Sequence, residues 1–259
     1  MAGDKTLRIF CFGDSLTAGY TYSGAAYHPY TIALTEKLSK DLSDTQVVAV
    51  ENGMPGDVVT QGAFAQRFES EVNQPESRDS EGLENPTTYD WVIILGGTND
   101  LALGVTPERI FECLKAAWDS ALAKGAKVLA LTVPECAYKN RVLDAARRRL
   151  NTAILSHQAP NYHALDLNSR TPYHDLTDRE RKRYWDDGVH LTPDGYDWMG
   201  GHIADALGNF IELERDPTSR RSQRAKRYKE EDIVSYDEET GDPRSLSEGY
   251  VVVRMRDLD

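Results

Sequence analysis

The sequence predicts an α/β protein whose parallel sheet is covered by helices on both faces. Short apolar runs alternate with segments of helical periodicity through most of the chain. This βαβαβ pattern is typical of a three-layer fold with right-handed crossovers. Several of the runs are continuously apolar instead of alternating, as expected of strands that are buried on both faces. Both observations therefore point to a buried parallel sheet.

Ten segments make up this pattern. The expected strands are residues 7–12, 47–51, 91–95, 128–131 and about 163–167. The expected helices are residues 30–42, 59–72, 107–124, 141–156 and a last helix from residue 192 onward. Two helix starts are clear, because Thr106 and Thr192 take N-cap positions before a proline. One apolar stripe on the last helix predicts its buried face; it is formed by Tyr196, Met199, Ile203, Leu207 and Phe210.

The charge distribution divides the chain into two parts. Residues 1–213 form the expected α/β domain, with a solvated loop at 73–89. The remainder, residues 214–259, is a charged extension that carries a basic block at 215–229 and an acidic block at 230–259. Such a composition is typical of a disordered tail, but two stretches of strand character around residues 241–243 also allow a hairpin docked on the sheet or on a second subunit. A homodimer formed through this extension is therefore one expectation.

The composition excludes several classes of function. The net charge of −12 argues against a nucleic-acid partner. No apolar run approaches the length of a membrane-spanning helix, and the first residues lack the apolar segment of a signal peptide, so we expect a cytoplasmic protein. Cys11, Cys113 and Cys136 are scattered and odd in number, which predicts buried free thiols in a reducing compartment and no metal site.

Two polar groups follow expected strands directly. Ser15 stands where the first strand ends, in the segment Gly-Asp-Ser-Leu at residues 13–16, and Asn99 follows the third strand in Gly-Gly-Thr-Asn-Asp at 96–100. Ligands bind beyond the carboxyl ends of the strands in open parallel sheets, so these residues are candidates for a nucleophile and for a donor to an oxyanion. Each could instead simply cap a helix or close a turn.

A base for such a serine is suggested by the loop that enters the last helix. Of six histidines, only His190 has an acid three residues before it, Asp187, in the segment Asp-Gly-Val-His. An acid at this spacing can hold the imidazole in place, and Asp186 is an alternative orienting residue. Serine, amide, histidine and acid at one edge of the sheet together form a hydrolytic constellation.

These three blocks, at residues 13–16, 96–100 and 187–190, closely resemble those of the GDSL, or SGNH, hydrolases, and the resemblance covers about residues 6–213. It implies a flavodoxin-like α/β/α sandwich around a five-stranded parallel sheet, with Ser15, His190 and Asp187 as the catalytic residues. It further implies an oxyanion hole formed by the backbone N–H groups of Ser15 and a glycine together with the Asn99 amide. The matching glycine is Gly56, with Gly53 as the alternative.

The expected activity is hydrolysis of small carboxylic esters by a serine enzyme without cofactor or metal. The chain has no long apolar insertion to cover a fatty chain, which favours short acyl groups, and the loops at 20–30 and 134–139 are candidate pocket walls. Carbohydrate O-acetylesterase, thioesterase and lysophospholipase activities stay open within the family. A metal-dependent phosphoesterase using Asp14, Asp100, Asp187 and His190, or a non-catalytic binding module, would be alternatives of another class. In the preferred interpretation, Asp14 and Asp100 are structural, and each stabilises the turn in which it lies.

Overall fold

The computed structural model describes residues 5–73, 77–78, 84–85 and 89–215 of the chain. The chain divides into two compact units, residues 1–206 and 207–259, and helix α9 runs through the division. The first unit contains the sheet and every candidate site residue. The second is described only over residues 207–215, the end of α9. The strand-like stretches of the extension lie outside the described residues, and the boundary at residue 213 stays a prediction.

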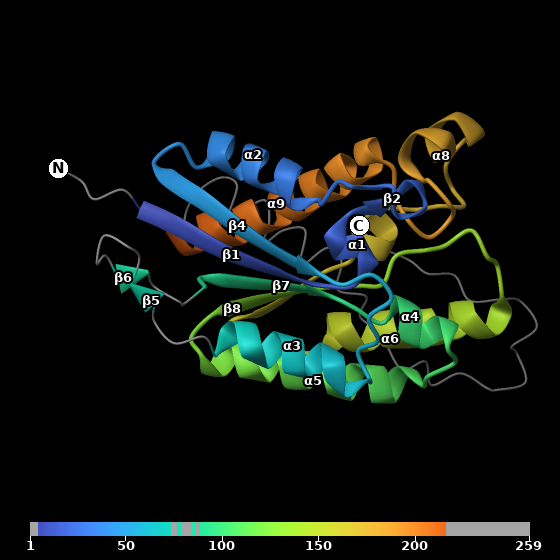
Figure 1. The fold of residues 1–259 in the computed structure, drawn as a ribbon, viewed down its shortest axis with the longest axis horizontal. Helices are drawn as coiled ribbons and strands as arrows, with labels where there is room; N and C mark the ends of the chain where they lie inside the picture. Colours follow the sequence, from blue (N-terminus) through green and yellow to red (C-terminus); the bar gives the residue numbers. More distant parts are fainter. Residues whose placement is uncertain (1–4, 74–76, 79–83, 86–88, 216–259) are drawn as a thin grey trace, which may run out of the picture. The chain divides into compact units, whose positions relative to one another are not determined.

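A five-stranded parallel sheet forms the centre of the first unit, as predicted (Figure 1). In spatial order its strands are β4 (Thr45–Gly53), β1 (Lys5–Gly13), β7 (Trp91–Leu95), β8 (Lys127–Leu131) and β9 (Tyr162–Leu165). Numbered along the chain, this order is 2-1-3-4-5, the order of flavodoxin-like folds. The order reverses between β1 and β7, and folds of this type bind ligands beyond the carboxyl ends of the strands at that point.

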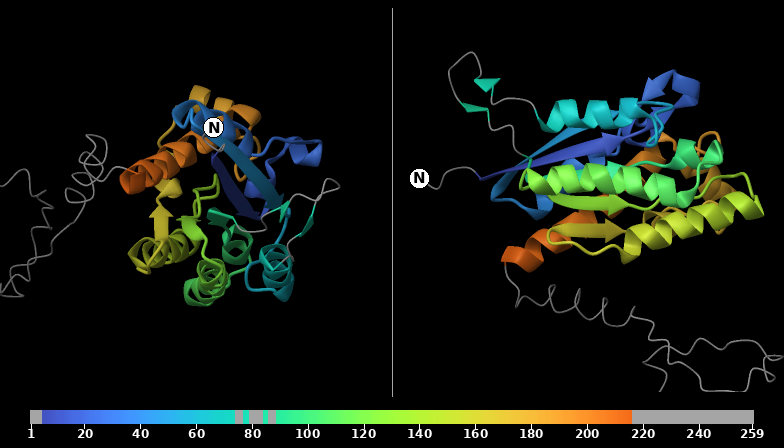
Figure 2. Two further views of the ribbon diagram at one scale, coloured as in Figure 1. Left: turned by 90° about the vertical axis from the view of Figure 1, so that its left-hand side faces the viewer. Right: turned by 90° about the horizontal axis from the view of Figure 1, so that it is seen from below.

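Helices cover both faces of the sheet, because successive side chains of each buried strand point to opposite sides. On one face lie α3 (Gly62–Val72), α5 (Pro107–Ala123) and α6 (Arg141–Ser156), which Figure 2 shows from their outer side. Phe10 and Phe12 of β1 share a core cluster there with Phe64 and Phe68 of α3. The fold is therefore the expected three-layer sandwich.

The opposite face is covered by α2 (Thr31–Asp41) and by residues 193–206 of α9 (Pro193–Arg215) (Figure 1). The two helices approach closely at Gly200, where a Cβ atom would lie 2.4 Å from the Tyr30 carbonyl oxygen. Tyr30 itself is fully buried. It is therefore a core residue and not part of the pocket wall that we expected from residues 20–30.

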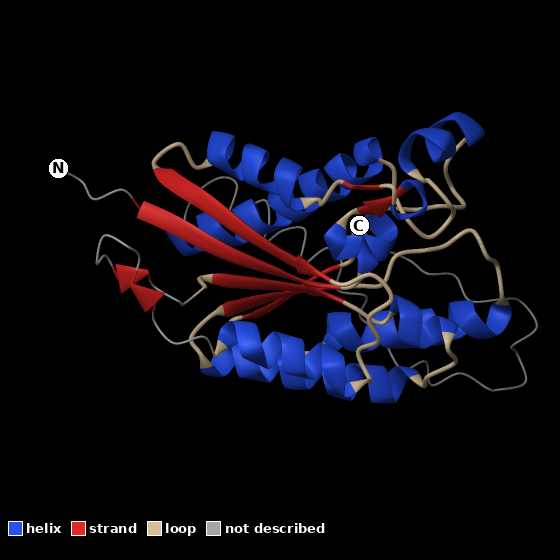
Figure 3. Cartoon of the chain, viewed as in Figure 1, coloured by secondary structure: helices blue, strands red, loops and turns tan. Residues whose placement is uncertain are grey.

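The predicted long elements agree with the structure to within a few residues, but several short elements were not predicted. These are α1 (Ser15–Ala18), α4 (Thr98–Ala102), α7 (Leu167–Arg170), α8 (Asp178–Tyr184), η1 (Tyr22–Gly24) and two antiparallel pairs, β2 (Tyr20–Thr21) with β3 (Ala26–Tyr27) and β5 (Ser77–Arg78) with β6 (Glu84–Asn85). Elements of two to seven residues are too short for periodicity to reveal. The loops and short helices that follow β1, β4 and β7 lie at the edge toward which the strand arrows point (Figure 3).

The expectations about caps and cysteines are confirmed only in part. Thr106 takes the N-cap position of α5, although its side chain accepts no capping hydrogen bond, and the Thr192 hydroxyl caps α9 by accepting a hydrogen bond from the Gly195 N–H at 3.1 Å. All three cysteines are free, and Cys11 and Cys136 are buried, whereas Cys113 is only partly buried. No helix among the described residues is long and apolar enough to cross a membrane.

Candidate active site

Ser15 is placed by the turn that ends β1. Asp14 is the N-cap of α1, and its Oδ1 accepts a hydrogen bond from the Leu16 N–H at 3.0 Å. Ser15 is then the first residue of this short helix, so its own N–H has no intrahelical partner. Gly13 allows the tight turn, since a Cβ atom there would lie 2.3 Å from the Leu95 carbonyl oxygen. Ser15 is 6% exposed, so most of the residue is covered by the surrounding turn.

The imidazole of His190 connects Ser15 to Asp187. Its Nε2 lies 2.9 Å from the Ser15 Oγ, and its Nδ1 lies 2.7 Å from the Asp187 Oδ2. The three side chains thus form one continuous hydrogen-bonded chain, although 175 positions separate the histidine from the serine. With Nδ1 donating to the carboxylate, Nε2 is left to accept the serine proton, which is the arrangement of a nucleophile with its base.

The loop 186–190 orients this histidine. The Asp187 Oδ1 accepts hydrogen bonds from the N–H groups of Val189 and His190, at 2.9 and 2.8 Å. Partial burial opposes ionisation of Asp187, but the hydrogen bonds from the His190 side chain and from these two N–H groups outweigh it and lower the pKa of the carboxyl. Gly188 adopts φ +85°, and its carbonyl accepts a hydrogen bond from Ala137 N–H at 2.7 Å. The carboxylate therefore stays ionised and fixed beside the imidazole.

Asp186, the alternative orienting residue, has different partners. Its Oδ2 accepts a hydrogen bond from the Tyr22 N–H at 2.6 Å and one from the Thr21 hydroxyl at 3.5 Å. It therefore fastens the β2–β3 hairpin to the histidine loop. The Tyr20 ring of this hairpin lies beside the imidazole, with 4.5 Å between the His190 and Tyr20 ring centroids.

Asn99 and Gly56 are the candidate donors to an oxyanion. Asn99 lies in α4, and its Nδ2 donates to the Asp57 carbonyl oxygen at 2.8 Å, which leaves the second amide hydrogen for a ligand. Gly56 has φ +80° and no atom within 4 Å of the place of a Cβ. Gly53, the alternative, already donates its N–H to the Glu51 carboxylate and is packed against the α1 backbone. The contacts therefore favour Gly56 over Gly53.

Asp100 and Asp14 make the turn contacts expected of them. Asp100 accepts hydrogen bonds from the N–H groups of Val59 and Thr60, both at 2.9 Å, and so fixes the end of the Gly56 loop. Burial, together with the nearby carboxylates of Asp100 and Asp57, raises the pKa of Asp14 to about 7 even though the Leu16 N–H opposes the shift. Among the described residues, no group of three or more His, Cys, Asp or Glu side chains is arranged to hold a metal ion.

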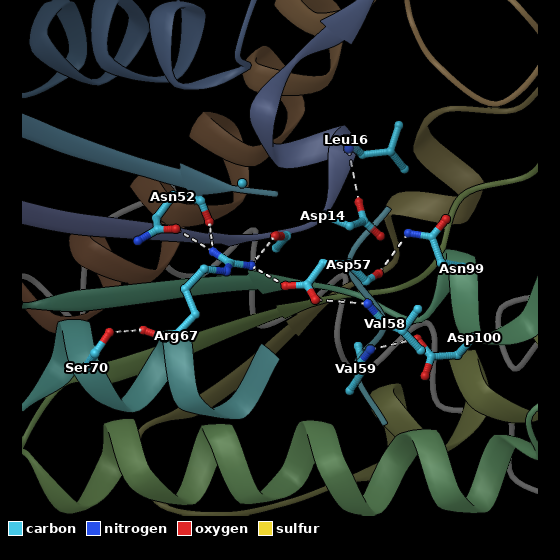
Figure 4. Close-up of polar contacts among 12 residues, drawn as sticks. Asp14, Leu16, Asn52, Asp57, Val58, Val59, Arg67, Ser70, Asn99 and Asp100 are labelled. Atoms are coloured by element: carbon cyan, nitrogen blue, oxygen red, sulfur yellow. Dashed lines mark hydrogen bonds and ion pairs between the residues drawn. The ribbon is translucent and has the colours of Figure 1, made fainter. Parts of the chain in front are cut away.

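Sequence reasoning missed one residue close to the site, Arg67 of α3. Its guanidinium makes hydrogen bonds to Asn52, Gly13 and Asp57 (Figure 4). Only one feature of the sequence could have revealed it. Arg67 is a charged residue on the helical face formed by Phe64 and Phe68, which are both buried.

The fold and the Ser-His-Asp contacts define a flavodoxin-like α/β protein with the arrangement of a serine hydrolase. The sequence model of the GDSL-like lipase/acylhydrolase family matches residues 11–198. The chain therefore belongs to this family, a family of carboxylic ester hydrolases. No match was found among curated proteins.

Solved structures share the fold at low sequence identity. A member of the lipolytic G-D-S-L family from Veillonella parvula aligns with a TM-score of 0.58 and 22% identity over 78% of this chain and 98% of that one. The lipase Lip_vut3 from a goat rumen metagenome aligns with a TM-score of 0.59 and 17% identity, over 77% of this chain and 97% of that one. A carbohydrate esterase family 3 protein from Talaromyces cellulolyticus aligns with a TM-score of 0.55 and 14% identity, over 80% of this chain and 98% of that one. At such identities the likeness concerns the fold alone.

Proposed function

We propose that the protein hydrolyses carboxylic esters through Ser15, His190 and Asp187, with an oxyanion hole made by the Ser15 and Gly56 N–H groups and the Asn99 amide. The observation that carries the proposal is the unbroken chain of hydrogen bonds from the Asp187 carboxylate through His190 to the Ser15 hydroxyl. If Ser15 only capped a helix and His190 only lay at the surface, nothing would require the three side chains, which come from two segments far apart in the sequence, to be aligned in this way.

In the proposed mechanism, the Ser15 Oγ attacks the ester carbonyl while His190 Nε2 accepts its proton. The carbonyl oxygen becomes an oxyanion, which the three donors stabilise. His190 then gives the proton to the departing alcohol, and an acyl-enzyme ester remains on Ser15. Water, deprotonated by His190, attacks this ester and releases the acid, and the proton returns to Ser15.

The proposal is tested with Ser15→Ala and a fluorophosphonate probe that labels activated serines. We expect wild type to hydrolyse p-nitrophenyl acetate and to take up the probe. Loss of the nucleophile lowers turnover by about 10⁶-fold in a well-studied hydrolase, so Ser15→Ala should do neither measurably. Equal turnover by the two proteins would refute the role of Ser15, and EDTA-sensitive turnover without labelling would favour a metal-dependent phosphoesterase.

We further propose short acyl esters as substrates. The sequence supports this preference, because it has no long apolar insertion that would cover a fatty chain. A series of p-nitrophenyl esters from acetate to palmitate tests it, and a maximum of kcat/KM at long chains would refute it. Carbohydrate O-acetylesterase, thioesterase and lysophospholipase activities are separated by assays on acetylated sugars, acyl thioesters and lysophospholipids.

A homodimer formed through residues 214–259 and a reducing, cytoplasmic compartment remain proposals that rest on the charge blocks and on the three free cysteines. If blocks of opposite charge join two subunits, the association should weaken as salt screens them. Sedimentation of the full chain at low and high salt measures this, and a monomer at both would refute the dimer.

A further inference from the structure

Arg67 contacts three segments that meet at the site. Its Nη2 donates to the Gly13 carbonyl at 2.8 Å and to the Asp57 Oδ2 at 2.7 Å, and its Nη1 donates to the Asn52 carbonyl at 2.7 Å and to the Asn52 side chain (Figure 4). The guanidinium carbon lies 3.9 Å from the centroid of the Phe12 ring. The Arg67 side chain is only 16% exposed and that of Asp57 only 8%. This is an inward-facing charge with a planar, multidentate set of partners, which arginine suits and lysine does not.

Two of the three partners of Arg67 lie close to residues of the proposed machinery. Gly13 ends β1 two residues before Ser15, Asn52 lies near the end of β4, and Asp57 directly follows Gly56. Asp57 is also held from its other side, where the Asn99 Nδ2 donates to its carbonyl oxygen at 2.8 Å. Asp57 is therefore bonded on one side to the Arg67 guanidinium and on the other to the Asn99 amide, which we assign to the oxyanion hole.

The part of the loop around Gly56 has little packing of its own, unlike Val58 and Val59, which are buried. No atom lies within 4 Å of the place of a Cβ at Gly56, and Met54 is half exposed. Donors stabilise an oxyanion strongly only when they are held in place before the charge develops. The start of the loop is held by the Met54 N–H, which donates to the Gly13 carbonyl oxygen at 3.1 Å, and its end by the buried side chains of Val58 and Val59. Between them, the hydrogen bond from Arg67 to the Asp57 carboxylate and those from the Val59 and Thr60 N–H groups to Asp100 add polar contacts.

We propose that Arg67 is a positioning residue for ester hydrolysis, which ties the Gly56–Asp57 segment to the end of the strand that carries Ser15. This inference rests on the proposed function. It assigns Arg67 no contact with the substrate. Its effect is on the distance between the nucleophile and the Gly56 N–H, so it should influence turnover more than substrate binding.

The test compares Arg67→Met with a matched control, Arg149→Met. Methionine keeps much of the apolar stem but removes every donor, and Arg149 is an exposed residue of α6 whose side chain pairs with Glu108. A displacement of about 1 Å can cost about 10²-fold in rate. We therefore expect kcat on p-nitrophenyl acetate to fall by about 10²-fold in Arg67→Met with KM changed by less than about threefold, and to stay unchanged in the control.

A second measurement follows the loop itself. Hydrogen exchange of the backbone amides of residues 54–60 should be faster in Arg67→Met than in wild type. Asp57→Asn removes the charge of the side chain but keeps a hydrogen-bond acceptor and most of the shape. This variant replaces Arg67→Met in the test if Arg67→Met does not fold. Its kcat should fall by about tenfold, in line with the loss of one charge-assisted hydrogen bond.

The outcomes separate this inference from the proposed function. A folded Arg67→Met protein with unchanged kcat overturns the inference, even if it melts at a lower temperature, because its role would then be structural only. A change confined to KM also overturns it. Failure of the proposed function would be seen in a different comparison, because Ser15→Ala would then hydrolyse esters as fast as wild type.

Discussion

Burial of the Asp14 carboxyl predicts a pH-dependent loss of stability. The side chain is 1% exposed, its Oδ1 accepts the Leu16 N–H, and its Oδ2 has no hydrogen-bond partner among the described residues. Burial first, and then the nearby carboxylates of Asp100 and Asp57, raise its pKa from the usual 3.8 to about 7. In the folded protein Asp14 therefore keeps its proton up to about neutral pH.

The sign of the effect follows from proton binding by the two states. Between about pH 4 and 7, the unfolded chain has released the Asp14 proton while the folded protein retains it. The unfolded state thus binds fewer protons, so the free energy of unfolding falls as pH rises through this window and becomes constant above it. A separation of about three pH units corresponds to about 4 kcal/mol, at about 1.4 kcal/mol per unit.

Urea denaturation of wild type and Asp14→Asn at pH 4.5, 6 and 8 measures this contribution. Asparagine cannot ionise, so the free energy of unfolding of the variant relative to wild type should rise by about 3 kcal/mol between pH 4.5 and 8, since part of the effect already occurs below pH 4.5. Asp119→Asn, which changes an exposed carboxylate paired with Lys115, should show no such trend, because surface pairs contribute little. A difference between Asp14→Asn and wild type that is the same at every pH would refute the argument.

Five further substitutions test the assignment of the site in three comparisons. Asn99→Ala should lower kcat by about 10²–10³-fold, as measured by steady-state hydrolysis, because one oxyanion donor is lost; a loss below about threefold would contradict the role. Asp187→Asn should cost about 10³–10⁴-fold, whereas Asp186→Asn should cost about tenfold or less; the reverse ranking would make Asp186 the orienting residue. Gly53→Ala should lower the free energy of unfolding by about 1–3 kcal/mol, since its Cβ would lie 2.1 Å from a backbone nitrogen of α1. Gly56→Ala should cost only the strain of a positive φ, about 1–2 kcal/mol, and denaturation of both variants checks this contrast.

The long elements could be predicted because their cause is local. The run Trp91–Leu95 is buried at every position, and its bounds agree with the prediction. Helix α6 spans Arg141–Ser156, also as predicted, and its N-cap Asn140 accepts hydrogen bonds from the first helical turn. Continuous apolarity and helical periodicity are properties of neighbouring residues, so both can be read without knowledge of the fold.

The contacts that complete the site depend on the fold and could not be predicted in this way. The carboxylates of Asp186 and Asp187 are adjacent in sequence but have different partners, since one accepts a hydrogen bond from the β2–β3 hairpin and the other contacts the imidazole. Arg67 was missed for the same reason, since its partners lie 10 to 54 residues away along the chain. The motif blocks indicated which groups meet, but not what holds them together.

The acidic side chains around the proposed oxyanion hole raise an electrostatic difficulty. Asp14, Asp57 and Asp100 lie close enough together that the latter two raise the pKa of the first, and a negative field there would oppose an oxyanion. The structure counters each charge differently. Arg67 pairs with Asp57, two backbone N–H groups satisfy Asp100, and Asp14 stays protonated up to about pH 7. These carboxylates also fix the turns that carry the proposed oxyanion donors. Their negative charge must therefore be offset at each position, by a cation at Asp57, by N–H groups at Asp100 and by a proton at Asp14.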